Sequence, residues 1–257
     1  MRPKEVSLFS HCLKLKSFRQ MLAKAKQSIR SAVYSIIKPP YAPQSYSQAG
    51  EDAILRFLFK DKKIKEIRYL DIGTNVPDYG NNTYLFYKDG SSGVCVDADK
   101  TLIPLIKKLR PRDTVINVGI AVSHEKDADF YIFDLNGINT FNKEEAEKRS
   151  KTGTHKIKEI VRVPLLSINE LIQKNFDSYP HLLSLDIEGL DLVVLKSLDY
   201  LKFPIPVICV ETCVYSENHI RAKDNSIAEF LSGKGYEIYA DTYINTIFVN
   251  KKWFYKI

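Results

Sequence analysis

The chain has 257 residues, 44% of them apolar and 27% charged, which suits one large α/β domain with an extension or two small domains. No apolar run reaches the roughly 18 residues of a spanning helix, and the N-terminus lacks the apolar block of a secretory signal, so neither is expected. The four cysteines show no zinc or redox spacing, so we expect a reducing, cytoplasmic compartment.

The positive charge is concentrated at the start of the chain. Residues 1–50 hold nine basic residues and one acid, whereas the other 207 residues hold 29 basic and 30 acidic residues. The main part is therefore nearly neutral, which argues against a broad nucleic-acid surface on it.

Residues 7–38 predict a basic amphipathic helix, because apolar residues recur there at spacings of three and four with lysines between them. Pro39 and Pro40 end the pattern, so residues 1–44 are predicted to be a helical extension with a proline-rich linker. The helix has three open interpretations: docking on the domain or a second subunit, contact with an anionic membrane surface, and nucleic-acid binding.

Beyond Gln44, short apolar strands alternate with helical patterns, as in a parallel sheet. Strands are predicted at 67–72, 93–96, 114–122, 182–185 and 207–210, and helices at 102–109, 168–174 and 190–198. Residues 236–240 and 245–249 predict a closing hairpin, residues 128–135 an extra strand, and residues 142–160 a mobile insertion rich in lysine and glutamate. The predicted fold over 45–257 is α/β: a doubly wound, Rossmann-like, seven-stranded sheet, mostly parallel with an antiparallel C-terminal hairpin strand.

Acidic residues stand at four predicted strand ends. They are Asp71, Asp97, Asp186 and Glu211. In a doubly wound sheet, ligands bind beyond the carboxyl ends of the strands. Each acid alone also fits a helix cap or a turn, but four on one edge favour a ligand site.

The first two strand ends favour S-adenosylmethionine over a nicotinamide cofactor. Gly73 lets the backbone take a positive φ and approach a ligand closely. Asp71 suits a cationic amine or an ordered water, and Asp97 suits the two hydroxyls of a ribose. A dinucleotide needs a loop with several glycines around its pyrophosphate, and only Gly73 is present. S-adenosylmethionine has no phosphate, and its positive sulfonium and amine fit an acidic loop.

The sequence resembles the FkbM-type methyltransferases from about residue 46 to residue 251. The segments that carry the resemblance, in this order, are 46–52, 71–75, 82–86, 93–98, 163–168, 183–189 and 191–195. Members of this family include O-methyltransferases acting on natural products and sugars. The resemblance implies a transferase that uses S-adenosylmethionine.

The resemblance also implies a cofactor-binding set. Asp71, Gly73 and Asn75 would lie by the methionine half, and Asp97 with Ala98 by the ribose. The Ser-Gln-x-Gly-Glu-Asp element that contains Gln48 would fold over the pocket. One departure is that many relatives carry histidine in the loop after the first Asp-Ile-Gly, where this chain has Asn75 and Val76.

Three residues are candidates for catalysis. The resemblance places Asp186 and Glu188 toward the substrate, with Asp186 also beside the cofactor, and His219 follows the fifth strand. Alignment of the reacting atoms supplies about 7–11 kcal/mol, and a general base adds roughly 10²–10⁴-fold. Asp186 and Glu188 are the base candidates. The alternatives are a divalent metal bound with Glu211 and purely structural roles. No metal ligands are assigned, and a metal is not expected.

We therefore expect an S-adenosylmethionine-dependent O-methyltransferase acting on a hydroxyl of a sugar, glycan or similar small polar molecule. The alternatives are methylation of RNA or protein, and a catalytically silent ligand-binding or assembly module at a membrane. We expect a cytoplasmic protein, with peripheral contact of residues 7–38 with anionic membranes and an oligomer as open alternatives.

Overall fold

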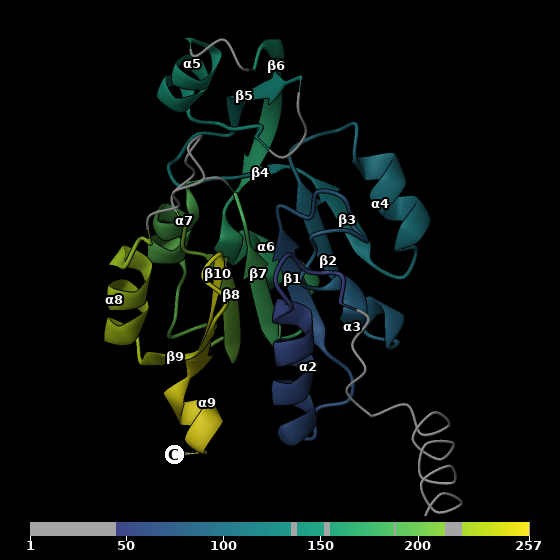
Figure 1. Ribbon diagram of the computed structural model, residues 1–257, viewed down its shortest axis with the longest axis vertical. Helices are drawn as coiled ribbons and strands as arrows, with labels where there is room; N and C mark the ends of the chain where they lie inside the picture. The colour runs from purple at the N-terminus through teal and green to yellow at the C-terminus, as the bar shows by residue number, and fades with distance from the viewer. Residues whose placement is uncertain (1–44, 135–137, 152–154, 188, 214–222, 257) are drawn as a thin grey trace, which may run out of the picture. The chain divides into compact units, whose positions relative to one another are not determined.

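The computed structural model describes residues 45–134, 138–151, 155–187, 189–213 and 223–256. A seven-stranded sheet has the order β3-β2-β1-β7-β8-β10-β9 (Figure 1). Its strands are β1 (Arg68–Ile72), β2 (Ser92–Asp97), β3 (Thr114–Asn117), β7 (Leu182–Leu185), β8 (Val207–Glu211), β9 (Tyr236–Asp241) and β10 (Asn245–Asn250). β10 is antiparallel to β8 and β9, whereas the pairings among β3, β2, β1, β7 and β8 are parallel. The predicted seven-stranded sheet with one antiparallel strand is confirmed.

Helices cover both faces of this sheet. On one face α6 (Ile168–Asn175), α7 (Asp191–Ser197) and α8 (Ser226–Gly233) contribute to one apolar cluster, and on the other α2 (Glu51–Asp61), α3 (Tyr84–Lys88) and α9 (Lys251–Tyr255) contribute to a second. β1 alternates between the two clusters, with Leu70 and Ile72 in the first and Tyr69 in the second. Because both faces of the sheet are buried, the parallel strands consist of continuous runs of apolar residues in the sequence. α4 (Ile103–Leu109) contacts β3.

A smaller sheet lies beyond the carboxyl edge of the large one (Figure 1). It has the order β4-β6-β5, from β4 (Gly119–Ile120), β5 (Asp127–Phe133) and β6 (Ile157–Leu166), with α5 (Lys143–Lys151) between β5 and β6 in the chain. β5 is the extra strand predicted at 128–135.

The single strand predicted over 114–122 is wrong, because the chain there forms two strands in two sheets. β3 ends at Asn117, where its partner β2 also ends, at Asp97. The chain then turns away and pairs with β6 as β4. A Cβ on Gly119 would lie 2.4 Å from Cζ of Phe141, so a larger residue there would have to displace that ring.

Regular structure in the charged stretch 142–160 was not predicted. The segment contains α5 and the first part of β6. α5 buries only Ala146 and Arg149, and Arg149 Nε lies 3.1 Å from Glu145 Oε1 one turn earlier. A helix with so small an apolar face leaves no periodic signal in the sequence.

The helix and linker predicted over residues 1–44 lie outside the described residues, so the three interpretations of this helix stay predictions. In the part of the chain that the structure describes, no helix is long and apolar enough to cross a membrane.

Candidate active site

The four acidic strand ends come together at one edge of the large sheet. The chain adds β2 and β3 on one side of β1, and β7 and β8 on the other. At such a reversal the loops diverge and leave a crevice beyond the carboxyl ends of the strands. Asp71 and Asp97 lie on the β1–β2 side, and Asp186 and Glu211 lie at the ends of β7 and β8.

Gly73 brings the ends of β1, β2 and β7 into close contact at this reversal. Its N–H donates to the Val96 carbonyl at 2.9 Å, and its φ is 81°, as expected for a glycine turn. A Cβ on Gly73 would lie 1.9 Å from the carbonyl oxygen of Asp186. The close approach made by Gly73 is therefore to the end of β7, which fixes Asp186 against the turn after β1.

Asp71 lies in a buried network with a cation that the sequence did not single out. Its Oδ2 accepts from Thr83 Oγ1 at 2.7 Å and Asn81 Nδ2 at 2.9 Å, and lies 3.3 Å from Nη1 of Arg110. Arg110 is fully buried, and its Nε also pairs with Asp113 at 2.7 Å. The protein thus supplies a positive partner for Asp71.

Asp97 and Asn75, both predicted for the cofactor, contact each other directly. Oδ2 of Asp97 accepts the Asn75 N–H at 2.8 Å, and Oδ1 accepts the Asp99 N–H at 2.8 Å. Burial raises the pKa of Asp97 to about 6, although these two hydrogen bonds act in the opposite direction. Each carboxylate oxygen keeps a further lone pair, so Asp97 can still accept from a ligand hydroxyl. The neighbouring Ala98 is half-buried.

Asn245 Oδ1, opposite Glu211 of β8, is buried without a hydrogen-bond partner among the described residues. Two further such amide oxygens lie in the loop after β1. They are Oδ1 of Asn75, whose φ is 51°, and Oδ1 of Asn82. Asn82 Nδ2 donates to Ser184 Oγ on β7 at 3.3 Å, which orients the amide. An unpaired buried acceptor costs about 1–3 kcal/mol, and a ligand amine or hydroxyl would satisfy it. Asn82 belongs to the recognised segment 82–86 but received no role from the sequence.

The acids of the element that contains Gln48 hold the element itself in place. Asp52 accepts from Ser45 Oγ at 2.7 Å, and Oε1 of Glu51 accepts from Thr242 Oγ1 at 2.6 Å. Glu51 also accepts from Asn245 Nδ2 at 3.1 Å, so the element is joined to the turn between β9 and β10. Gln48 is exposed, with its Cγ 3.6 Å from where a Cβ on Gly80 would lie. The loop therefore lies against the segment that follows β1.

On the β7 side, Asp186 is half-buried, and its N–H donates to the Ile72 carbonyl at 3.1 Å. Asp191, the first residue of α7, accepts the backbone N–H groups of Ile187 and Gly189, both at 3.2 Å. Burial raises the pKa of Asp191 to about 6, against those hydrogen bonds. Asp191 shapes this loop, and the sequence had not marked it for the site.

Two predicted catalytic residues, Glu188 and His219, lie outside the described residues. Within the described ranges, no group of three or more His, Cys, Asp or Glu side chains is placed to hold a metal ion. The proposed metal set with Glu188 is therefore untested.

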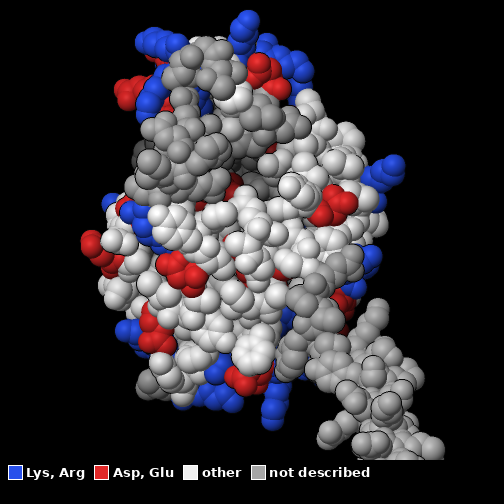
Figure 2. Space-filling model, viewed as in Figure 1, with Lys and Arg blue, Asp and Glu red and all other residues white. Residues whose placement is uncertain are grey.

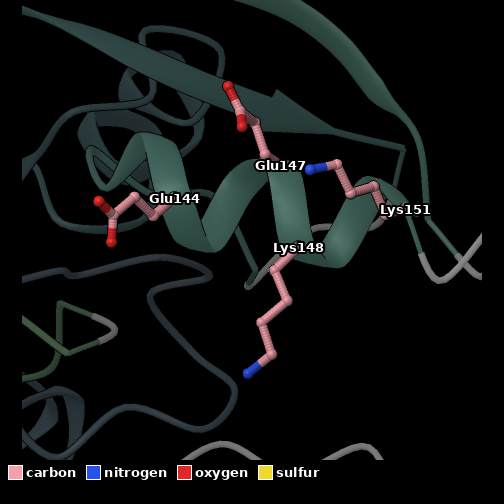
Figure 3. A pocket seen from close by; sticks show the side chains of 4 residues that line it. All are labelled: Glu144, Glu147, Lys148 and Lys151. Atoms are coloured by element: carbon pink, nitrogen blue, oxygen red, sulfur yellow. The ribbon is translucent and has the colours of Figure 1, made fainter.

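A hollow of about 350 Å³ lies between α5 and the ends of β7 and β8. It is lined mainly by polar side chains, among them Asn142, Glu145, Lys148, Arg149, Asp191, Glu211, Thr212 and Asp224. A second depression on α5 also includes Lys148, together with Glu144, Glu147 and Lys151. Figure 3 shows these four side chains leaving the helix in different directions, so they do not converge on a ligand. We take the hollow as the candidate acceptor site.

Comparison with family models identifies a methyltransferase domain in this chain. The model of the methyltransferase FkbM domain matches residues 71–238. A solved structure, a TehB-like SAM-dependent methyltransferase from Corynebacterium glutamicum, is 11% identical with a TM-score of 0.39, and the alignment covers 92% of this chain and 100% of that one. No curated protein matches the sequence.

Proposed function

Because the chain belongs to the methyltransferase FkbM domain family, whose model covers residues 71–238, we propose that it transfers a methyl group from S-adenosylmethionine to a hydroxyl of a sugar, glycan or similar small polar molecule. Methyltransferase activity follows from the family. The identity of the acceptor and the roles of individual residues are the proposal.

The turn after β1 suits a cofactor without phosphate. The N–H groups of Gly73 and Thr74 both donate to the Val96 carbonyl, at 2.9 and 3.2 Å, and the N–H of Asn75 donates to Asp97. Three successive backbone donors are therefore used within the protein. A pyrophosphate is held by free donors of this kind, so this turn does not favour a dinucleotide.

The same turn offers acceptors for a cationic, hydroxyl-bearing ligand. Asp97 would accept from the ribose hydroxyls, and the unpaired oxygens of Asn75 and Asn82 would accept from an amine or a hydroxyl. S-adenosylmethionine, when bound, supplies a methyl group on a positively charged sulfonium. The acceptor-rich lining fits that charge, because it offers carboxylate and amide oxygens.

The hollow beside α5 is the main observation that supports a small polar acceptor. Its carboxylates, amide and hydroxyl, with the Lys148 ammonium as a further donor, match the hydrogen-bonding pattern of a polyol. Arg149 is already engaged, since its Nη1 donates to the Ile138 carbonyl at 2.6 Å. On the face shown in Figure 2, basic and acidic side chains are interspersed. These features support a small polar acceptor over RNA, which is bound by basic patches.

Asp186 is our candidate for the base. Its backbone is fixed against Gly73 on the cofactor side, and it directly precedes the loop whose Gly189 and Asp191 line the hollow. A carboxylate at this boundary can accept the hydroxyl proton as the acceptor oxygen forms its new bond. Holding the acceptor in line accounts for about 7–11 kcal/mol of the barrier, and proton removal adds roughly 10²–10⁴-fold.

The test is methyl transfer from isotopically labelled S-adenosylmethionine to separate pools of sugar nucleotides, oligosaccharides, RNA and peptides. We expect a labelled methyl ether in a carbohydrate pool, identified by mass spectrometry, and much less product with Asp97→Asn. Label found only in RNA or peptide would contradict the acceptor proposal. Calorimetry showing binding of NAD but not of S-adenosylmethionine would contradict the cofactor.

A further inference from the structure

We propose that Arg110 is a positioning residue for the cofactor site and that Asp71 acts on the cofactor through this arginine and the loop 73–83. The inference rests on the cofactor part of the proposed function. It assigns to Asp71 a role different from that of a direct counter-ion.

Arg110 makes four polar contacts inside the protein. Nη1 lies 3.3 Å from Asp71 Oδ2 and 3.3 Å from Asn81 Oδ1, Nη2 donates to Thr83 Oγ1 at 2.8 Å, and Nε donates to Asp113 at 2.7 Å. The planar fork of a guanidinium supports such a set of directed hydrogen bonds, whereas a lysine ammonium does not reproduce it.

The location of Arg110 is fixed by its surroundings. It caps the C-terminal end of α4, where its N–H donates to the Ile106 carbonyl at 2.8 Å. The rings of Tyr69, Tyr84 and Tyr87 surround the guanidinium, with centroids 5.1, 5.9 and 5.7 Å from Cζ. These cation–π contacts add to the hydrogen bonds and hold the side chain in place.

The network fastens both ends of the loop that carries Asn75 and Asn82. Near its start, Asn81 Nδ2 donates to the Thr74 carbonyl at 3.2 Å as well as to Asp71. At its end, Asn81 Oδ1 accepts the Thr83 N–H at 2.9 Å, and the Thr83 hydroxyl joins Asp71 to Arg110. The positions of the two unpaired amide oxygens therefore depend on the pairing of Asp71 with Arg110.

Burial explains why Asp71 acts indirectly. Its side chain is 3% exposed and that of Arg110 is 0% exposed, and a buried carboxylate needs a charged or hydrogen-bonding partner. The protein provides these partners. In contrast, Asp97 receives only backbone N–H groups in the described contacts of its carboxylate, and a ligand can complete its environment.

The experiment measures binding of S-adenosylmethionine and of its demethylated product by calorimetry, with thermal unfolding in parallel. The variants are Arg110→Lys, Arg110→Met, Asp71→Asn and the double variant Arg110→Met with Asp71→Asn. Arg112→Met is the matched control: Arg112 lies in the same turn but is exposed and donates to the carbonyls of Tyr87 and Ser91, outside the loop. Asp97→Asn is the control for a direct contact.

We expect Arg110→Lys and Arg110→Met to weaken binding by about tenfold or more, and Arg112→Met by less than about threefold. In the Arg110→Met background, Asp71→Asn recovers part of the affinity, because it removes a buried carboxylate left without its partner. Asp71→Asn alone weakens binding less than Asp97→Asn. Amide hydrogen exchange in peptides covering 74–83 becomes faster in Arg110→Lys but not in Arg112→Met.

Arg110 variants that fold and bind like the wild type, with unchanged exchange in 74–83, would overturn the inference. So would an Asp71→Asn variant that loses as much affinity as Asp97→Asn and gives no recovery in the Arg110→Met background. If Arg110→Met does not fold, Arg110→Lys decides, since it keeps the charge. A wild type that binds neither ligand instead overturns the cofactor assignment, and the exchange measurement still tests the coupling between Arg110 and the loop.

Discussion

Replacing Gly73 with alanine tests the contact that joins the cofactor side of the site to the acceptor side. Two costs arise. The φ of 81° is left-handed, which costs a non-glycine residue about 1–2 kcal/mol. The new methyl group would also lie 1.9 Å from the Asp186 carbonyl oxygen, which is backbone and cannot rotate away. Forced displacement of packed atoms typically costs about 1–3 kcal/mol more.

Gly235→Ala separates the two costs. Gly235 has a φ of 86°, and a Cβ there would have no heavy atom within 4 Å. It therefore carries the conformational cost without the collision. We expect a loss in the free energy of unfolding of about 2–5 kcal/mol for Gly73→Ala, the two costs combined, and of about 1–2 kcal/mol for Gly235→Ala.

Urea unfolding of both variants, monitored by circular dichroism, measures these losses. We expect cofactor affinity to fall in Gly73→Ala, because the turn at Gly73 carries Asn75 and adjoins Asp186. It should not fall in Gly235→Ala, because Gly235 precedes β9 and has no contact with that turn in the described structure. Equal losses of stability in the two variants, or undiminished cofactor affinity in Gly73→Ala, would show that the contact between Gly73 and Asp186 is unimportant.

Four further predictions concern individual groups. Burial raises the pKa of Asp97 to about 6. Because the ionised carboxylate accepts ligand hydroxyls best, we expect the cofactor affinity of the wild type, measured by calorimetry, to rise between about pH 5 and pH 7. The affinity of Asp97→Asn stays flat over this range, and a flat wild-type profile contradicts the prediction. The pKa of Asp191 is likewise raised to about 6. The stability that Asp191 contributes is therefore complete below its pKa in the unfolded chain, about 3.9, and is lost as the pH rises through 6. Urea unfolding at several pH values should show a smaller loss of stability in Asp191→Asn, and the same pH dependence in both proteins argues against this role. Asp186→Asn lowers turnover far more than cofactor affinity, whereas equal losses in both would make Asp186 a cofactor or folding residue. We further propose that residues 1–44 hold the enzyme on anionic membranes: a chain that begins at Gln44 stays folded and binds cofactor but no longer sediments with anionic liposomes, while a full-length chain that ignores liposomes contradicts the proposal.

Much of the large sheet could be predicted because burial on both faces leaves continuous apolar runs. The strand predicted at 182–185 coincides with β7, and the acids at the carboxyl ends of β1, β2, β7 and β8 stand at the predicted edge. The break after Asn117 was not predictable in this way, because it depends on where the partner strand β2 ends. α5 was missed because its contacts with the rest of the protein are few and its composition is that of an exposed segment.

Within the candidate site, the sequence predicted several of the residues but not which of them contact one another. Arg110 is separated from Asp71 by 39 residues, and an arginine that follows two lysines on a helix resembles a surface residue. Only the folded structure, in which Tyr69 of β1 and Tyr84 and Tyr87 of α3 surround the guanidinium, shows that this one is buried. Asn82 and Ser184 are 102 residues apart, so their contact also depends on the finished sheet.

The hydrogen bonds of Glu51 with the β9–β10 turn affect how the enzyme is made. Glu51 and its partners Thr242 and Asn245 are separated by 191 and 194 residues. Domains begin to fold during synthesis from the N-terminal end, but a nascent chain that stops before residue 242 contains no partner for Oε1 of Glu51. The hydrogen bonds that join this loop to the β9–β10 turn can therefore form only when the last strands have left the ribosome, whereas the bonds of Asp52 with Ser45 can form earlier.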